Sequence, residues 1–517
     1  MNFDLMIRNG IIFDGSGNPG FKSDIYVSDG KIVKITRLNV EKADEIIDAK
    51  GFVVAPGFID IHQHSDFTLF GCPKCDSYIH QGVTTISVGN CGLSPAPLSD
   101  EYKEDLKRYY ESFTIGLNMP YSWNSFGEFL DELENLKPGI NIWPQIGHCS
   151  LRAAVMGFDA ARKANEKELE AMSELLEQSM KDGATAMSIG WYAPAYWADT
   201  NEIIKLAKIV NKYGGIYTTH LRSSPMGVDE AFKVGETAGI PVEIAHYGFN
   251  EPARRGIMEA RAKGIEVTYD AYPYCAGSSL LGQFLPYEVY EGGVDAMLEK
   301  IKDEKFRDNM KKQAKARGRT WDKNIIAWVP NKNSKKYEGM SIEEAARSEV
   351  TDPIDFICEL LIENEGNGMH VSMNGRRESY IFNTLQDPNH YIMSDGWGLA
   401  PYEPIKRGVI HPRAYGSFPR VLGWYVRECE AIPPQEAIRK MTWGPAQKMG
   451  IWDRGLLREG MRADITVFDP DTIIDKATFK EPHQYPVGIE YVILNGKVVI
   501  KNGEHTEIRS GKILRRT

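Results

Sequence analysis

Short apolar runs alternate with helical segments through the middle of this 517-residue chain, and this alternation constrains the fold more than any other feature. Lys167–Lys181 and Glu202–Lys212, for example, carry apolar residues at helical spacing between successive runs. Strands that alternate with helices predict a parallel sheet with crossover helices. The expected strands are Phe58–Ile61, Val83–Gly89, Ile142–Gly147, Thr185–Gly190, Gly215–Thr219, Val242–Ala245, Glu266–Tyr269, Met369–Met373 and Tyr391–Ser394.

Nine strands are one more than a closed (β/α)8 barrel holds, so one of them should lie outside the barrel. We assign Met369–Met373 to that place because it falls in a long insertion. The insertion begins near Leu281, is rich in lysine and glutamate up to about Asn367, and follows the end of the seventh strand. The carboxyl ends of the strands form the face of such a barrel where active sites lie. Because the insertion follows the end of a strand, we expect it to be a mobile cover over that face. A surface insertion unrelated to function is the alternative.

Both ends of the chain are rich in β-branched residues, and Asn-Gly or Asp-Gly turn signals separate their apolar runs. Two β-rich ends that flank one long α/β region predict that the termini meet in a joint β-sandwich. We therefore expect residues 1–55 and 456–517 to build the sandwich and residues 56–455 to build the barrel. The expected strands of the sandwich lie within Phe3–Phe13, Asp24–Ile35, Glu45–Val54, Ala463–Phe468 and Ile489–Lys501.

The overall charge and the N-terminus argue against several classes of protein. A formal net charge of -10 gives a surface that repels nucleic acid and anionic membranes, although a few local arginines can still bind a small anion. Residues 1–10 lack the basic start of a secretion signal, and no apolar stretch is long enough to span a bilayer. Seven cysteines in so long a chain do not indicate a disulfide framework. We expect a cytoplasmic protein that acts on a small molecule, and homo-oligomerisation stays open.

Polar residues of the kinds that bind metals follow the expected barrel strands again and again. The carboxyl ends of parallel barrel strands form a single face, so residues far apart in the sequence converge there. His62 and His64 are two residues apart on an extended chain and therefore point the same way. The full set of such residues is His62, His64, Cys91, His220, His246 and Asp395.

The donor types in this set indicate a zinc site. Imidazole and thiolate groups are zinc ligands, and a carboxylate can complete the set. Zinc with an open coordination position lowers the pKa of a bound water to about 7 and polarises a carbonyl group, which suits attack on an amide. A lone histidine at a strand end is more often a hydrogen-bonded structural residue, and Cys91 alone is an ordinary small buried residue. Their joint placement at strand ends favours the metal site.

Two other features carry weaker signals. The pair Cys72-x-x-Cys75 resembles half of a zinc or redox site, but the sequence has no second pair. We therefore interpret these two cysteines as structural. His148 also follows an expected strand, and we interpret it as a support of the site or a structural residue.

Several motifs resemble those of one family. The run Ala55–His64 is similar to the first-strand signature of the amidohydrolase superfamily, and further segments spread over nearly the whole chain resemble the D-aminoacylases, or N-acyl-D-amino-acid deacylases. These segments are Gln81–Thr85, Gly89–Gly92, Tyr217–Arg222, Ala271–Tyr274, Ser394–Gly396, His411–Arg420 and Glu481–Pro486.

The resemblance implies a distorted (β/α)8 barrel of the α/β class with a β-sandwich built from both termini. Many members of the superfamily bridge two metals with a modified lysine on the fourth strand, but Thr185–Gly190 contains no lysine. The resemblance implies that Cys91 takes its place. It further implies one tight zinc ion held by Cys91, His220 and His246. His62, His64 and Asp395 then form a weaker or empty second site, and Asp395 is the catalytic residue that moves the proton.

Two departures from the family pattern concern the substrate pocket. The family's substrate-binding lysine two residues after His246 is replaced by Gly248. The aromatic residue after the fourth strand has moved or been lost within Gly190–Pro194, which contains Tyr192. A substrate carboxylate needs a cation or a bidentate donor. The expected substrate contacts are Arg377, Tyr274, Arg222 and Tyr192.

The function that the sequence predicts is zinc-dependent hydrolysis of a C–N amide bond, with an N-acyl-D-amino acid as substrate. A related amidohydrolase acting on another amide or a cyclic imide is one alternative, and pocket residues separate the two. A metal-binding scaffold without catalysis is the other alternative. Asp395 argues against the scaffold, because a lost activity is expected to show first at the proton-transfer residue.

Overall fold

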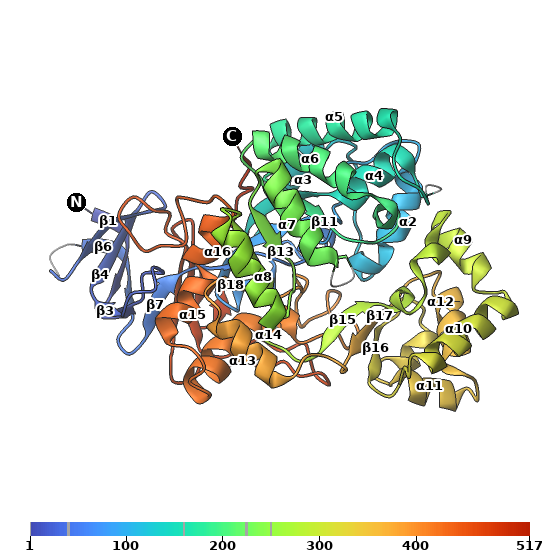
Figure 1. The fold of residues 1–517 in the computed structure, drawn as a ribbon. Helices are drawn as coiled ribbons and strands as arrows, with labels where there is room; N and C mark the ends of the chain where they lie inside the picture. Colours follow the sequence, from blue (N-terminus) through green and yellow to red (C-terminus); the bar gives the residue numbers. More distant parts are fainter. Residues whose placement is uncertain (1, 39–41, 159–160, 223–225, 249–250, 517) are drawn as a thin grey trace.

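Eight parallel strands form a nearly closed barrel in the computed structural model, which describes residues 2–38, 42–158, 161–222, 226–248 and 251–516 (Figure 1). The sequence prediction of a barrel is confirmed, and each strand lies within three residues of its expected bounds. The barrel strands are β8 (Phe58–Asp60), β9 (Val83–Val88), β10 (Asn141–Gly147), β11 (Ala186–Ile189), β12 (Ile216–Thr219), β13 (Val242–Ile244), β14 (Val267–Ala271) and β18 (His390–Ile392).

The barrel closes at the segments that follow its first and last strands. The amide of Asp395 donates to the carbonyl of His62 at 2.9 Å, and the amide of His64 donates to the carbonyl of Gly396 at 2.8 Å. These bonds join the loop after β8 to the loop after β18. Two regions that are more than 300 residues apart in the sequence therefore meet at the carboxyl ends of the strands.

Helices cover the outside of the barrel. The longest of them, Glu166–Asp182, begins with a capping box between Asn165 and Glu168 and ends at Gly183, whose φ of 117° suits a residue without a side chain. The helices outside the insertion are α1 (Asp76–Ile79), α2 (Lys103–Thr114), α3 (Phe126–Asn135), α4 (His148–Met156), α5 (Glu166–Asp182), α6 (Thr200–Lys212), α7 (Met226–Ala238), α8 (Glu251–Ala262), α13 (Glu378–Gln386), α14 (Arg413–Arg420), α15 (Pro434–Met441) and α16 (Trp443–Lys448).

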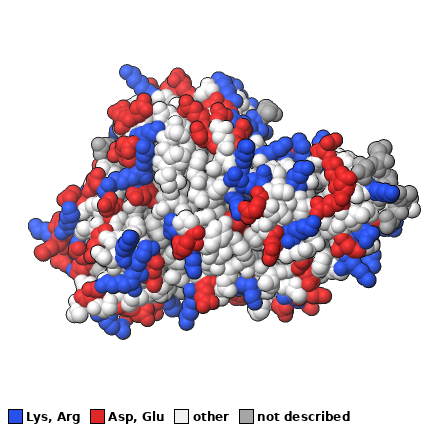
Figure 2. All heavy atoms as spheres, turned by 180° about the vertical axis from the view of Figure 1, so that it is seen from behind, with Lys and Arg blue, Asp and Glu red and all other residues white. Residues whose placement is uncertain are grey.

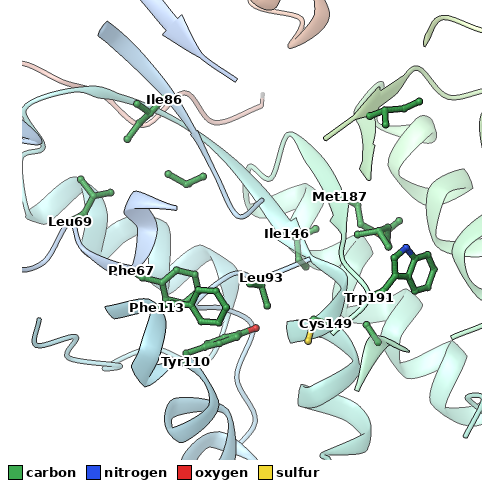
Figure 3. Close-up of a cluster of buried hydrophobic side chains, with 14 of the residues drawn as sticks. Phe67, Leu69, Ile86, Leu93, Tyr110, Phe113, Ile146, Cys149, Met187 and Trp191 are labelled. Atoms are coloured by element: carbon green, nitrogen blue, oxygen red, sulfur yellow. The ribbon is translucent and has the colours of Figure 1, made fainter. Parts of the chain in front are cut away.

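An aromatic cluster fixes α2 against the loop after β8 (Figure 3). The ring of Phe67 lies 5.0 Å from that of Tyr110 and 5.5 Å from that of Phe113. All three side chains are buried. Burying large aromatic side chains stabilises a contact by about 1.5–3 kcal/mol each. The cluster therefore holds one side of α2 close to His64, whose ring lies 6.4 Å from Phe113.

The β-sandwich contains strands from both ends of the chain, as the sequence predicts. One sheet has the order β5-β4-β1-β6, and the other has the order β22-β21-β20-β19-β7-β2-β3. In the second sheet β7 pairs antiparallel with β19, so the N-terminal and C-terminal parts share one sheet. The strands are β1 (Asn2–Arg8), β2 (Ile11–Ile12), β3 (Phe21–Lys22), β4 (Asp24–Ser28), β5 (Lys31–Thr36), β6 (Lys42–Asp48), β7 (Val53–Pro56), β19 (Ile465–Phe468), β20 (Ile489–Leu494), β21 (Lys497–Lys501) and β22 (Glu504–His505).

The insertion forms a small sheet and a group of helices, drawn in yellow at the end of Figure 1 opposite the blue strands of the sandwich. The surplus strand Met369–Met373 is β17, and it lies outside the barrel as predicted. The sheet has the order β15-β17-β16. The insertion contains the strands β15 (Gly277–Leu280), β16 (Asn324–Trp328) and β17 (Met369–Ser372), the short 3-10 helices η3 (Leu281–Phe284) and η4 (Tyr287–Tyr290), and the helices α9 (Gly293–Lys300), α10 (Glu304–Ala316), α11 (Ile342–Ser348) and α12 (Pro353–Glu363).

The surface carries charges of both signs. Basic and acidic side chains lie next to each other over the face shown in Figure 2, consistent with the modest net charge of -10. Among the described residues, no helix has the length and apolar character needed to cross a bilayer.

Candidate metal centre

The six predicted metal residues follow five different barrel strands at the carboxyl-terminal face. His220 comes directly after β12, and His246 follows the end of β13 by two residues. Cys91 and Asp395 each stand three residues beyond their strands, while His62 and His64 stand two and four residues beyond β8. Since these strands are parallel strands of one barrel, their carboxyl ends bring all six side chains to one face.

The donor atoms meet in two groups that share His62. The first group is His62, Cys91 and His246, and the second is His62, His64 and Asp395, with all donor atoms of each group within 4.8 Å of one another. Cys91 Sγ lies 3.2 Å from His62 Nε2, 3.6 Å from His246 Nε2 and 4.0 Å from His220 Nδ1. The arrangement brings together every ligand that the sequence predicts. The sequence prediction assigned His62 to the second site with Asp395, whereas in the structure His62 lies next to both Cys91 and Asp395.

Three of these residues have a left-handed backbone. The φ angle is 54° at Cys91, 36° at His246 and 53° at Asp395. Such angles are uncommon for residues with a side chain and carry a cost of about 1–3 kcal/mol each. Their concentration at one site indicates that the surrounding loops hold these side chains in place for function.

The charge balance around Cys91 favours a thiolate. Burial by itself raises the pKa of the Cys91 thiol, but the positive charge of His62 and hydrogen bonds from His220 and His246 outweigh burial and hold the pKa well below its usual range. Burial lowers the pKa of His62, and the charges of Cys91 and Asp270 more than reverse that effect. A thiolate that faces three imidazole groups is the donor set that zinc prefers.

Asp270 supports the centre, although the sequence analysis did not single it out. Its carboxylate accepts from the backbone amide of His246 at 2.5 Å, and its second oxygen lies 3.3 Å from His62 Nδ1. A hydrogen bond to the far ring nitrogen fixes the tautomer and orientation of a ligating histidine. In the sequence, the only signal for Asp270 is an acidic residue near the end of the seventh barrel strand.

Asp395 lies between two histidines and an arginine. Its Oδ1 is 3.3 Å from His64 Nε2 and 3.6 Å from His62 Nε2, and its Oδ2 is 2.8 Å from Arg413 Nη1. Burial raises the pKa of Asp395, but the charge of Arg413 and the neighbouring histidines keep it well below its ordinary value. The ion pair with Arg413 is close but poorly directed, because neither Nη1 nor Nε of this buried arginine has a well-formed hydrogen bond.

The centre opens into a cavity at the mouth of the barrel. Five of the six predicted ligands line it: His64, Cys91, His220, His246 and Asp395. Tyr192, Tyr272, Arg413 and residues of the insertion complete the wall. A substrate in this cavity would therefore contact the donor atoms directly.

Comparison with known proteins agrees with this site. The profile described as "Amidohydrolase family" matches residues 45–207 and 341–500. A D-aminoacylase from Alcaligenes xylosoxydans xylosoxydans is 33% identical over 530 aligned residues, which cover 100% of this chain and 98% of that protein. The chain belongs to the D-aminoacylase family of the amidohydrolases. This amidohydrolase is thus a metal-dependent hydrolase of amide bonds.

Solved structures of the family share its fold. A D-aminoacylase crystal structure superposes with a TM-score of 0.83 and 31% identity, covering 99% of this chain and 100% of that one. An N-acyl-D-glutamate deacylase from Bordetella bronchiseptica, solved with zinc and a phosphonate inhibitor, gives a TM-score of 0.82 and 29% identity with both chains fully covered.

Three of the four expected substrate contacts of this amidohydrolase lie outside the cavity. Arg377 is exposed at the start of α13, where its side chain faces solvent. Tyr274 is buried, and its hydroxyl donates to Asp475 at 3.2 Å. Arg222 stacks on the ring of Trp191 at 3.4 Å and donates to nearby backbone carbonyls and to a glutamate of α7. In this structure other groups engage the side chains of Tyr274 and Arg222, and Arg377 is exposed, so the role of these three residues as substrate contacts stays a prediction.

The fourth expected contact and two others face the cavity. Tyr192 lines it with its ring 6.1 Å from that of His220. Tyr272 also lines it, two residues before the predicted Tyr274. The guanidinium carbons of Arg376 and Arg413 lie 5.2 and 4.7 Å from the centre of the Tyr272 ring, and Arg413 also lines the cavity. After β17 it is Arg376, and not Arg377, that lies near Tyr272, although Arg376 is not among the residues that line the cavity.

The two weaker sequence features lie outside the metal groups. Cys72 and Cys75 are buried free thiols, with Cys72 Sγ 3.7 Å from a carboxylate oxygen of Asp76. His148 Nε2 lies 2.7 Å from Glu202, whose other oxygen accepts from Arg152 at 2.6 Å. Arg152 also donates to the carbonyl of Pro194 at 3.1 Å. This network ties the Tyr192 loop to the barrel, in keeping with a structural role for His148.

Proposed function

We propose that this chain hydrolyses N-acyl-D-amino acids to a carboxylic acid and a D-amino acid, with zinc as its metal. The observation that carries the proposal is the convergence of Cys91 with His62, His220 and His246 beside Asp395, at the mouth of a barrel that matches D-aminoacylases along its full length. A relative that cleaves N-acyl-D-glutamate was solved with zinc, and this supports the choice of metal.

In this proposal Cys91, His220 and His246 hold the tight zinc ion, and His62, His64 and Asp395 form a weaker second site. Bound zinc supplies a Lewis acid that activates a water molecule and polarises the substrate carbonyl. Asp270 orients His62 through Nδ1. The donor set fits zinc, because thiolate sulfur and imidazole nitrogen are the ligand atoms that zinc prefers.

Asp395 is the proposed proton carrier. Its carboxylate accepts a proton from the attacking water and then delivers it to the leaving nitrogen. An amine leaves poorly until it is protonated, so one carboxylate serves both steps. Arg413, 2.8 Å from Oδ2, holds the carboxylate in place and leaves Oδ1 toward the histidines.

The proposed site for the substrate carboxylate lies at Tyr272, near two guanidinium groups. The guanidinium carbons of Arg376 and Arg413 lie 5.2 and 4.7 Å from the centre of its ring, and Tyr272 and Arg413 line the cavity. Guanidinium groups bind carboxylates in a bidentate manner. Tyr192 is the proposed contact on the opposite side, next to His220.

A reduced, cytoplasmic setting is part of the proposal and is supported by the seven free thiols of the chain. The partner is a small molecule, and homo-oligomerisation stays a prediction.

A substrate screen tests the proposal. Zinc-loaded protein is assayed against matched N-acyl-D-amino acids, their L enantiomers, uncharged amides and cyclic imides. Turnover of the D series alone supports the proposed function. Turnover of only uncharged amides or imides assigns the chain to a related amidohydrolase activity, and zinc binding without any turnover assigns it to a metal-binding scaffold.

A further inference from the structure

Two neighbouring barrel strands, β10 and β11, are followed by none of the six predicted metal ligands. Near its end each strand carries an apolar residue, Ile146 or Met187, which lies in the buried hydrophobic cluster of Figure 3. The residues next to them, Gln145 and Ser188, point to the opposite face, the barrel interior, because side chains alternate along a strand. Both are buried, and a buried polar side chain is costly unless it is hydrogen-bonded. Their partners therefore indicate what they do.

The side chain of Gln145 joins the segments of two proposed ligands. Its Nε2 donates to Asn90 Oδ1 at 2.8 Å and to a serine hydroxyl of β9 at 2.7 Å, and its Oε1 accepts from the hydroxyl of Thr218 at 2.7 Å. Asn90 directly precedes Cys91, and Thr218 stands two residues before His220. One amide group of β10 thus connects the strand ends that carry the thiolate and one of the imidazole groups.

The same network continues to the loop after β8. Asn90 Nδ2 donates to the backbone carbonyl of Gln63 at 3.0 Å, and Gln63 lies between His62 and His64. The side chain of Gln63 donates in turn to the carbonyl of Ser87 at 2.5 Å. A chain of buried hydrogen bonds therefore reaches residues next to the proposed ligands of three barrel strands.

Ser188 holds the other side of the turn that carries Cys91. Its hydroxyl donates to the carbonyl of Gly89 and accepts from the amide of Gly92, the second bond at 2.9 Å. The φ angles in this turn are 77° at Gly89, 54° at Cys91 and 75° at Gly92. Glycine adopts such angles readily, whereas a residue with a side chain does so at a cost. Cys91 is thus the residue of the turn that most needs support from its surroundings.

We propose that Gln145 and Ser188 are positioning residues of the metal centre, which hold the Cys91 thiolate where the histidines converge. Neither is among the described residues that line the metal cavity, so they act through the turn and not on the substrate. A ligand that the fold already holds in place loses less freedom when the metal binds, and the affinity for the metal is higher. The inference rests on the proposed ligand set but not on the proposed substrate.

The affinity for zinc, measured by competition with a chelator, tests the inference. Gln145→Met keeps the length of the side chain and removes its three hydrogen bonds, and Ser188→Ala removes both bonds to the turn. Each variant should bind zinc about 10–100-fold more weakly, as is usual when an outer support of a metal ligand is lost. In cobalt-loaded protein the thiolate-to-cobalt charge-transfer absorption should weaken or shift. A loss of stability alone would leave this absorption unchanged.

Asn141 provides the matched control, because it is a buried amide on β10 at the opposite, amino-terminal end of the strand. Its Nδ2 donates to Asp464 at 3.0 Å, and its Oδ1 accepts from Asn495 at 2.8 Å. Asn141→Leu should therefore lower the melting temperature, as Gln145→Met does, while its zinc affinity and cobalt spectrum stay those of the wild type.

The inference is wrong if Gln145→Met and Ser188→Ala bind zinc as tightly as the wild type, or if Asn141→Leu loses as much affinity as they do. Ser188→Ala removes a single oxygen atom and decides the question by itself if Gln145→Met does not fold. Cys91→Ala separates this failure from a failure of the ligand set. Zinc lost in Cys91→Ala but kept in both variants removes only the positioning role, whereas wild-type affinity in Cys91→Ala removes the proposed ligand and the inference with it.

Discussion

The guanidinium group of Arg376 lies against Gly248, so that a Cβ atom at Gly248 would come within 3.1 Å of Arg376 Nε. Arg376 also donates to the carbonyl of His246, two residues earlier in the same loop. The position where the family has a lysine thus lacks a side chain, and a guanidinium from another segment stands beside it. Positive charge is therefore present next to the metal centre despite the glycine.

We predict that Arg376→Met weakens binding of N-acyl-D-amino acids. Removing an arginine that pairs with a substrate carboxylate costs about 2–5 kcal/mol, mostly in binding. KM should therefore rise steeply for these substrates and change little for matched uncharged amides. The exposed neighbour provides the control, and steady-state kinetics of Arg377→Met should match the wild type. Equal losses of Arg376→Met on charged and uncharged substrates would make Arg376 a structural residue.

Asp270 gives a prediction about the metal itself. Asp270→Asn replaces the carboxylate beside His62 Nδ1 and should lower the affinity for zinc by about 10–100-fold, the usual effect of losing such a support. Competition with a chelator measures this affinity. Asp308→Asn, at an exposed position on α10, is the control for charge removal. If Asp270→Asn binds zinc as tightly as the wild type, Asp270 has a packing role and does not support the metal site.

The barrel and the metal residues could be predicted from the sequence because both depend on local patterns. A parallel strand is buried on both faces, as all six residues of Val83–Val88 are, and it gives a short run rich in β-branched residues such as V-T-T-I-S-V. A polar residue just after such a run lies at the carboxyl-terminal face whatever the rest of the chain does. By contrast, β15 has the sequence Gly-Ser-Ser-Leu and is only half-buried, so it carries no apolar signal.

The substrate contacts depend on loop paths that a pattern does not specify. Alternation along an extended strand says which of two neighbours points inward, but β17 ends at Ser372 and the chain then turns. For that reason the sequence pointed to Arg377, whereas Arg376 is the arginine that lies near Tyr272. Arg413 reaches Asp395 from α14, and this contact exists only once the loops after β8 and β18 have closed the barrel.

Buried histidines predict how stability changes with pH. Burial lowers the pKa of His80 and of His370 to about 4, below the value of about 6.5 for an unfolded histidine. Between these two values the unfolded chain binds protons that the folded chain does not. The stability that these residues contribute is complete above about pH 6.5 and is lost as the pH falls toward 4, by up to about 1.4 kcal/mol per pH unit for each histidine.

Thermal unfolding across this pH range checks the prediction. His80 stacks on Tyr485 at 3.7 Å, and its Nδ1 lies 2.8 Å from the carbonyl of Asp76, so neither contact involves a predicted metal ligand. His80→Gln should therefore flatten the decline of the melting temperature below pH 6.5 relative to the wild type. His505, whose ring lies 6.4 Å away and whose pKa is also lowered by burial, should keep part of the slope. If the melting temperature of His80→Gln falls as steeply below pH 6.5 as that of the wild type, His80 is not the source of the decline.

The last prediction concerns the proton carrier. Asp395→Asn keeps the shape of the side chain but cannot accept the proton of water, so kcat should fall by about 10²–10⁴-fold, the usual contribution of general acid–base catalysis. Circular dichroism and zinc content should show that the fold and the tight site persist. Because the same group also protonates the leaving nitrogen, an ester analogue with a phenol leaving group, which needs no such proton, should lose less activity than the amide. A loss of less than tenfold on the amide, or equal losses on amide and ester, would leave Asp395 as a metal ligand without the second half of its proposed role.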